Sequence, residues 1–503
     1  MRHRPPQPRR VGPLTISLKR LERGIDLLPL AGSLPAGQPV VWLDSARVHP
    51  VTGRWSILAW DPWLTCRVSG DQVEIRTSAS TTVRKAHPLE ALRALLNRYR
   101  LGDRDAAALG AAARPIGLLG YLSYDMNRWI ERLPAPQPSA HALPEMLWFG
   151  MRRTVLVDHA DDRSWLISVA DPHGPSGAAR REAAQGIEQL EALLHAEPSA
   201  DRAALPWTAG PIEATSSQPA FEAMVARALA QIRAGDIYQA NISQRFLAPW
   251  SGDPLALYAR LRAINPSPFA CFLAWDDAAI VSCSPERLVR VQDGWVDTRP
   301  IAGTRPRGGS ADEDAMQSLE LLLSEKERAE HVMLVDLARN DLGRISAPGT
   351  VVVNELIALE HYSHVMHIVS DVAGRLAPGA DLVDAIRAVF PGGTITGCPK
   401  VRCMQILREV EPVARGLYTG SVGYLGFSGM MDLNIAIRTM VLQGGRLSYH
   451  AGAGIVADSD PSREYQETLA KAAALERALA PASGAQAPGL SGFAEVPGHA
   501  AVR

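Results

Sequence analysis

The sequence is poor in cysteine, and its charges nearly cancel. It has 5 Cys in 503 residues, and 52 Lys+Arg stand against 53 Asp+Glu, which gives a formal net charge of -1. So few scattered cysteines exclude a disulfide-rich scaffold and favour a reducing compartment, so we predict a cytoplasmic protein. The neutral balance offers no sign of the basic patch typical of nucleic-acid or membrane-surface binding, and we expect neither partner.

Long apolar runs are also missing. No stretch approaches the ~20 apolar residues that a membrane-spanning helix needs. The first residues, MRHRPPQPRR, lack the apolar segment of a signal peptide. Hydrophobic residues make up 47% and charged residues 21% of the chain, which is typical of globular proteins. The composition therefore predicts a globular protein of enzyme size.

Changes in composition divide the chain into two main segments with a tail at each end. Residues 1–13 are basic and Pro-rich and residues 481–503 are rich in Ala, Gly, Pro and Ser, so we predict both as disordered tails. A Pro- and Ser-rich stretch that follows an Ala/Glu-rich helical segment indicates a boundary between residues 205 and 216. We predict an N-terminal domain over residues 14–205 and a catalytic domain over residues 216–480.

Short apolar runs bounded by turn residues predict strands in both segments, and runs with a helical period predict helices between them. Strands and helices come in clusters, without the regular alternation that builds a parallel sheet. We therefore predict an α+β fold with mainly antiparallel sheet. Helices are predicted over residues 89–100, 221–232, 324–345 and 462–479, and a strand over LNIAIRTM, residues 433–440.

Two of these helices each carry carboxylates on one face. Glu327 and Glu330 are three residues apart in the first, and Glu464, Glu467 and Lys471 follow at i, i+3 and i+7 in the second. Two such faces could hold one hard cation, because Mg²⁺ prefers oxygen ligands. Helical spacing alone favours the alternative of two solvated faces with Glu–Lys pairs.

Three Gly-rich turns and two charged or titratable side chains are further candidates. The turns at residues 300–309, 390–400 and 450–460 offer backbone N–H groups to a ligand, although Gly clusters are more often simple turns. Arg438 lies in the predicted apolar strand and needs an anionic partner, either a structural carboxylate or a bound one. His367 could transfer a proton near neutral pH, although a single His in a strand is more often structural.

In order along the chain, six segments resemble the chorismate-utilising enzyme family. They are SPERLVRV, PIAGTRPRG, RAEHVMLVDLARNDLGRI, GGTITGCPKVRCM, LNIAIRTM and GAGIVADSDPSREYQETLAKA. The resemblance is dense over residues 218–478, and WLDSAR and GLLGYLSYD extend it more loosely into the first half. It implies two large, mainly antiparallel β-sheets packed as a sandwich with helices outside.

The resemblance also implies an active site. Mg²⁺ would be bound through Glu330 and Glu467, with Glu327 and Glu464 nearby. Glu286 would be the general acid that protonates the departing C4 hydroxyl of chorismate, and His367 and Lys471 would complete the catalytic set. Chorismate, a dicarboxylate, would be bound by Gly303, Thr304, Thr396, Tyr418, Arg438, Gly452, Gly454 and Lys471.

Within the family, four segments resemble the branch that forms 4-amino-4-deoxychorismate for 4-aminobenzoate and folate synthesis. They are WLDSAR, NPSPFACFL, IYQANISQRF and MDLNIAIRT. Ala302 departs from that branch, where a lysine commonly attacks chorismate, and resembles the anthranilate-forming branch instead. We predict the first activity, with anthranilate synthesis as the alternative within the family.

Glutaminase activity needs a nucleophilic cysteine in a tight turn flanked by glycines, and no cysteine of this sequence has that setting. Cys398, in TGCPK, comes nearest to it. We therefore expect a separate glutamine amidotransferase partner to supply ammonia. A non-catalytic chorismate-binding scaffold is the alternative from another class, and the intact set of candidate residues argues against it.

Overall fold

The computed structural model describes residues 8–49, 52–135, 137–139, 141–174, 177–196, 202–361 and 365–480. The tail predicted over residues 481–503 lies outside the described residues, as do residues 1–7. The prediction of disorder was wrong for residues 8–13. Residues Arg9–Val11 form a strand, β1, that pairs with the next strand, β2 (Leu14–Leu21), because an open backbone edge is available there.

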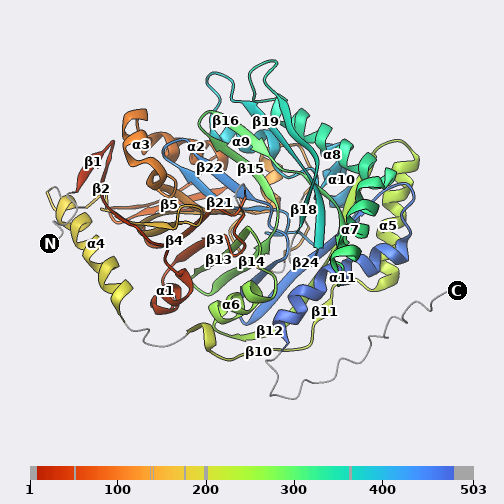
Figure 1. Cartoon of the computed structure of the whole chain (residues 1–503), viewed down its shortest axis with the longest axis horizontal. Helices are drawn as coiled ribbons and strands as arrows, with labels where there is room; N and C mark the ends of the chain where they lie inside the picture. The colour runs from red at the N-terminus through yellow and green to blue at the C-terminus, as the bar shows by residue number, and fades with distance from the viewer. Residues whose placement is uncertain are drawn as a thin grey trace.

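The first segment is mostly strand (Figure 1). Its further strands are β3 (Val40–Asp44), β4 (Trp55–Ser69), β5 (Gln72–Thr77), β6 (Thr81–Lys85), β7 (Gly117–Leu122), β8 (Met146–Asp158) and β9 (Arg163–Val169). Its helices are α1 (Leu27–Ser33), α2 (Pro88–Arg98), α3 (Asp103–Leu109) and α4 (Ala179–His195).

The second segment adds more strands and the helices that carry most candidate residues. Its strands are β10 (Trp207–Ala209), β11 (Glu213–Ala214), β12 (Gln239–Gly252), β13 (Phe269–Trp275), β14 (Ala278–Ser284), β15 (Arg287–Gln292), β16 (Trp295–Thr298), β17 (Ile301–Pro306), β18 (Val352–His361), β19 (Val365–Arg375), β20 (Gly397–Cys398), β21 (Ser421–Gly426), β22 (Met431–Asn434), β23 (Thr439–Gln443) and β24 (Arg446–Ile455). Its helices are α5 (Gln218–Arg233), α6 (Pro254–Ile264), α7 (Ala311–Leu323), α8 (Glu325–Gly343), α9 (Leu382–Val389), α10 (Lys400–Val410) and α11 (Pro461–Leu479).

The predicted α+β class with antiparallel sheet is confirmed. Strand pairing runs in the order β12–β24–β23–β14–β13–β3–β4–β8–β7–β21–β22–β15–β16–β19, and each of these pairings is antiparallel. The path folds back on itself, because the rings of Tyr121 on β7 and Trp275 on β13 meet at 5.6 Å although several strands separate them in the pairing order. Its two arms thus pack face to face as a sandwich, joined through the long strands β4 and β8.

The two segments share this sheet. β3 of the first segment pairs with β13 of the second, and β7 pairs with β21. The predicted linker region also contains strands, since β10 and β11 both pair with β12. The division at residues 205–216 stays a prediction.

Side-chain caps define the starts of the two carboxylate-bearing helices. Ser324 accepts a hydrogen bond from the backbone N–H of Glu327 at the start of α8, and Asp460 does the same for Arg463 at the start of α11. Pro461 occupies the first turn of α11, where no backbone donor is needed. Both helices were predicted close to these bounds. α8 packs on β17 and β19, and α11 packs on β24.

The strand predicted over LNIAIRTM was wrong, because it is two strands. β22 ends at Asn434 and β23 begins at Thr439, and the chain bends between them. Arg438 has a φ of 50°, in the left-handed region that side chains rarely adopt, so it cannot continue a strand. The bend places Arg438 at the end of β23 rather than inside an apolar sheet.

The five cysteines are free thiols, as predicted, and all but the half-buried Cys398 are buried. In the described part of the chain, no helix is both long and apolar enough to span a membrane.

Candidate active site

The candidate site lies where the two ends of the strand path meet. β12 and β24 form one end, and β19 with its neighbour β17 forms the other. α8 faces both ends. A Cβ built on Gly303 of β17 would lie 3.0 Å from Glu327 Oε2, and one built on Gly454 of β24 would lie 3.8 Å from Glu330 Oε1. Figure 1 shows α7, α8 and α11 together on this side of the molecule, away from α3 and α4.

Glycine is needed on β24 because neighbouring groups fill the space of a side chain. A Cβ on Gly452 would lie 2.5 Å from Asn241 Oδ1 and 2.8 Å from the Tyr418 hydroxyl. A Cβ on Gly454 would lie 2.8 Å from Gln239 Nε2. The predicted residues Gly452, Gly454 and Tyr418 therefore share one crowded, polar surface.

The four predicted carboxylates gather between α8 and α11. Gln239 donates to Glu330 at 2.6 Å, and Glu467 pairs with Lys471 at 2.7 Å. Burial raises the pKa of Glu330, and the nearby charges of Glu327 and Glu467 raise it further. Repulsion between carboxylates thus remains at Glu330, although Arg305 pairs with Glu327 at 3.1 Å.

These carboxylates fit a bound cation. Glu464 Oε2 is buried without a hydrogen-bond partner in the described part of the chain, and burial followed by the charge of Glu467 raises the pKa of Glu464. A divalent ion would relieve both the repulsion and the unpaired oxygen. No three acidic, His or Cys side chains of the described residues already converge to ligand geometry, so Mg²⁺ stays a prediction.

Glu286 lies in the turn between β14 and β15 and is only 5% exposed. Thr394 Oγ1 donates to its Oε1 at 2.7 Å. Burial raises the pKa of Glu286 to about 7, although the Thr394 hydrogen bond and the charge of Arg438 oppose the change. A carboxyl group of this kind is protonated in a large fraction of molecules at neutral pH, as a general acid must be.

His367 on β19 is buried, and its Nδ1 lies 3.4 Å from the carbonyl oxygen of Gly303. Burial lowers the pKa of His367 to about 4, and the positive charges of Arg438 and Lys471 lower it as well. His367 is therefore neutral at physiological pH. Thr304 lies opposite His367 in the β17–β19 pairing, and its side chain is outside the described part of the structure.

Two cations border the site. Lys471 donates to the carbonyl oxygen of Gly452 at 3.0 Å, and its charge acts on His367. Arg438 acts electrostatically on both Glu286 and His367. The structure thus brings Glu286, His367, Arg438 and Lys471, which come from four distant segments of the chain, into one region, and their roles stay a prediction.

Tyr418 and Thr396 are buried beside this region. The Tyr418 ring stacks on His450, with 5.0 Å between the ring centroids and 10° between the ring planes. Burial raises the pKa of Tyr418 to about 12, so the hydroxyl remains a neutral donor. Thr396 is fully buried, and its Oγ1 has no hydrogen-bond partner among the described residues.

Sequence reasoning missed several contacts at the site. Thr394 lies two residues before the predicted Thr396, and nothing in the sequence shows that it reaches Glu286. Gln239 was missed for the same reason. Glu411 and Arg415 form a buried ion pair at 2.8 Å, and Arg415 donates to the carbonyl oxygen of Asn241 on β12. Glu411 also accepts from Ser243 on β12, and an i, i+4 Glu–Arg spacing was the only available signal.

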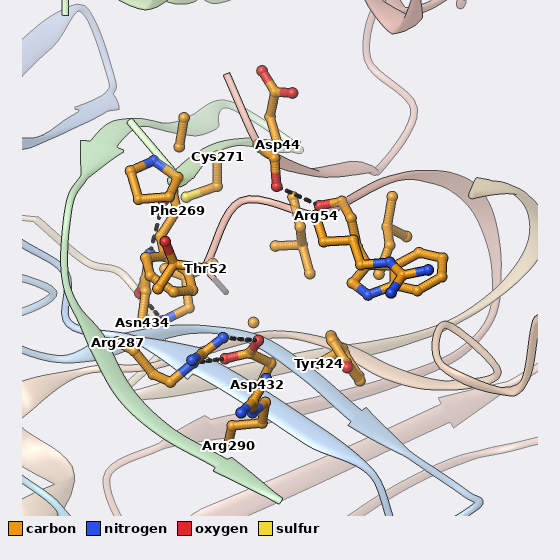
Figure 2. A pocket seen from close by; sticks show the side chains of 18 of the residues that line it. Asp44, Thr52, Arg54, Phe269, Cys271, Arg287, Arg290, Tyr424, Asp432 and Asn434 are labelled. Carbon is orange, nitrogen blue, oxygen red and sulfur yellow. Dashed lines mark hydrogen bonds and ion pairs between the residues drawn. The ribbon is translucent and has the colours of Figure 1, made fainter. Parts of the chain in front are cut away.

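A second cavity, of about 350 Å³, lies between the segments and away from this site. Figure 2 shows Asp44 and Arg54 on one side of it and Arg287 on the other, with Nε and Nη2 of Arg287 donating to the carboxylate of Asp432 at 2.9 and 3.0 Å. Residues of WLDSAR, NPSPFACFL and MDLNIAIRT line this cavity, and the last of these segments also carries Arg438 of the candidate site.

Comparison with known proteins identifies this chain as an enzyme that acts on chorismate. The chain belongs to the family of chorismate binding enzymes, whose model matches residues 39–477. Within the family it is of the anthranilate and aminodeoxychorismate synthase type.

Its relatives divide between those two activities. Aminodeoxychorismate synthase component 1 of Bacillus subtilis is 40% identical over 441 residues, covering 87% of this chain and 91% of that protein. Anthranilate synthase component 1 of Cereibacter sphaeroides is 41% identical over 448 residues, covering 87% and 88%. The solved structure of anthranilate synthase component I from Streptococcus pneumoniae superposes with a TM-score of 0.74 at 35% identity, over 85% of this chain and 93% of that one.

Proposed function

We propose that this chain is the aminating component of an aminodeoxychorismate synthase. It would convert chorismate and ammonia to 4-amino-4-deoxychorismate and water, with a C–N bond formed and the C4–O bond broken. The relatives are named component 1, which supports a second component, and we propose a glutamine amidotransferase that supplies the ammonia.

The buried Glu286 carries the proposal that chorismate is turned over. Loss of the C4 hydroxyl needs a proton on the departing oxygen, and a carboxyl group with a pKa of about 7 can hold that proton at neutral pH. Thr394 holds one carboxyl oxygen by its 2.7 Å hydrogen bond, and the backbone of Ile301 also donates to the carboxyl group, so the acid is held in place within the site.

The remaining residues bind and orient the substrate. Arg438 and Lys471 supply the positive charge that a dicarboxylate needs. Neutral His367 can accept or donate a hydrogen bond without adding charge. Mg²⁺ held by Glu330 and Glu467, with Glu327 and Glu464 beside them, would supply positive charge to a substrate carboxylate.

Ala302 supports the alternative, anthranilate synthesis. It is an almost buried residue of β17, and its methyl group cannot attack chorismate. Under our proposal ammonia must then add directly, without a covalent enzyme intermediate. Of the segments that favour the aminodeoxychorismate branch, WLDSAR and NPSPFACFL line the second cavity, whereas IYQANISQRF and MDLNIAIRT contribute Gln239 and Arg438 to the candidate site.

A product assay separates the two activities. Purified protein would be mixed with chorismate, Mg²⁺ and an ammonium salt, and the products would be separated by chromatography and identified by mass. We expect 4-amino-4-deoxychorismate and no pyruvate. Equimolar anthranilate and pyruvate would assign the alternative, and inhibition by tryptophan would point the same way. A lack of any turnover would favour the non-catalytic scaffold.

A further inference from the structure

A third cavity, of about 190 Å³, lies behind Tyr418. It continues the same face of the β12–β24 pair that carries the candidate active site. Arg245 pairs directly with His450, two residues along the strands from the pairing of Ser243 with Gly452 that lies at the site, and alternate residues of a strand point to the same face. Tyr418 is the wall between the two spaces, since its ring stacks on His450 and its hydroxyl lies against Gly452.

Arg245 is the unusual member of this cavity. It is 8% exposed, and its Nε is buried without a hydrogen-bond partner in the part of the chain that the structure describes. None of the described carboxylates forms an ion pair with it, and burial alone lowers its pKa. A buried guanidinium without an anion is costly to a fold, so the position is explained if an anion binds there.

The other charged groups of the cavity are already paired. Glu145 pairs with Arg128 at 2.7 Å, and Asp125 lies 3.4 Å from Arg408. Arg415 is neutralised by Glu411. Both histidines of the cavity, His141 and His450, have their pKa lowered by burial, to about 4 for His141, so neither adds charge. Among the described residues that line the cavity, Arg245 therefore leaves one uncompensated positive charge.

The rest of the lining is suited to an aromatic ring. Tyr121 and Tyr418 border the cavity, together with Leu143 and Leu417. An apolar cavity of about 150 Å³ admits a benzene molecule, so this one has room for a six-membered ring and a small substituent. One cation beside aromatic and aliphatic walls matches a ring that carries a single carboxylate.

We propose that this cavity is a binding site for a small aromatic monocarboxylate, whose carboxylate pairs with Arg245 and whose ring packs against the tyrosines. The site is distinct from the candidate catalytic residues and shares only the Tyr418 wall with them. The proposal does not depend on which amination product the chain forms.

Calorimetric titration with benzoate tests the site. The wild type should bind benzoate, and saturating chorismate should not displace it. Arg245→Gln should weaken benzoate binding at least about tenfold, which is the effect of losing one hydrogen-bonded charge pair. Arg245→Lys should retain more affinity than Arg245→Gln. Arg446→Gln is the matched control, because Arg446 is an exposed cation near His141 and should leave benzoate binding unchanged.

The outcomes that overturn the proposal are equally specific. They are no benzoate binding by the wild type, equal binding by Arg245→Gln, and one-for-one displacement by chorismate, which would place benzoate at the substrate site. A thermal melt checks folding, and Arg245→Gln should be at least as stable as the wild type. Crystals grown with 4-bromobenzoate should show the bromine anomalous peak behind Tyr418, whereas a peak only beside Arg438 would contradict the site.

Discussion

Thr394 donates a 2.7 Å hydrogen bond to Glu286, whose carboxyl group is almost fully buried between two sheet strands. Burial and the hydrogen bond act on the pKa in opposite directions, and burial prevails. The result is an acid that titrates near neutral pH, so its protonation should be visible in the kinetics.

The pH dependence of chorismate turnover should therefore report on Glu286. The protonated form is active under our proposal, so kcat/KM should be constant at low pH and fall above a pH of about 7. Thr394→Val removes a donor that stabilises the ionised form, which should move this fall to higher pH by about one unit.

Two variants serve as controls for that profile. Thr394→Ser retains the hydroxyl and should leave the midpoint near its wild-type value. Glu286→Gln should lower kcat by about 100-fold or more and abolish the fall. A fall that stays near pH 7 in Glu286→Gln would show that another group titrates.

Glu330→Gln should weaken Mg²⁺ binding, because it removes charge from the centre of the four-carboxylate cluster. Direct calorimetric titration with Mg²⁺ in the absence of substrate should show at least about tenfold lower affinity. Asp336→Asn is a matched control on the same helix, since Asp336 is exposed and pairs only with Arg339 among the described residues. Equal affinities of Glu330→Gln and the wild type would refute the metal assignment.

Incubation with chorismate and Mg²⁺ but no ammonia should leave the wild-type protein unmodified, because Ala302 offers no nucleophile. Intact-mass spectrometry measures this directly. Ala302→Lys places an amine at that position and should give an adduct of the mass of chorismate less water. An adduct on the wild type would reveal a different attacking residue.

Glu411→Gln should destabilise the protein by about 3–5 kcal/mol, because it leaves the buried Arg415 guanidinium without its counter-charge. Urea unfolding followed by tryptophan fluorescence would show a lower midpoint. Breaking the exposed Asp336–Arg339 pair with Asp336→Asn should change the free energy of unfolding by less than about 1 kcal/mol. Similar midpoints for the two variants would contradict the structural role of Glu411.

The four helices predicted by residue range could be found from the sequence because their signals are local. An apolar period, a capping residue and a proline in the first turn are all visible within a few positions, and α8 and α11 both have such signals. The break at Arg438 was not predictable, because the apolar pattern of LNIAIRTM is typical of one continuous strand. The left-handed φ of Arg438 that divides it has no signal in the local sequence.

The site was predictable only in part, for a related reason. The motif resemblance identified Glu286, His367, Arg438 and Lys471, which the structure brings together. Contacts between distant segments were missed, such as Thr394 with Glu286 and Gln239 with Glu330. Such contacts depend on how the strand path closes, and no local pattern encodes that closure.

The sharing of strands between the two segments has a consequence for synthesis. During translation β3 and β7 are made long before β13 and β21, the strands with which they pair. Each early strand therefore has one unpaired edge until its partner has been synthesised. Open edges of this kind invite pairing with other chains. An interrupted translation product that ends between the segments should therefore aggregate, and the nascent first half should depend on chaperones until its later partners emerge.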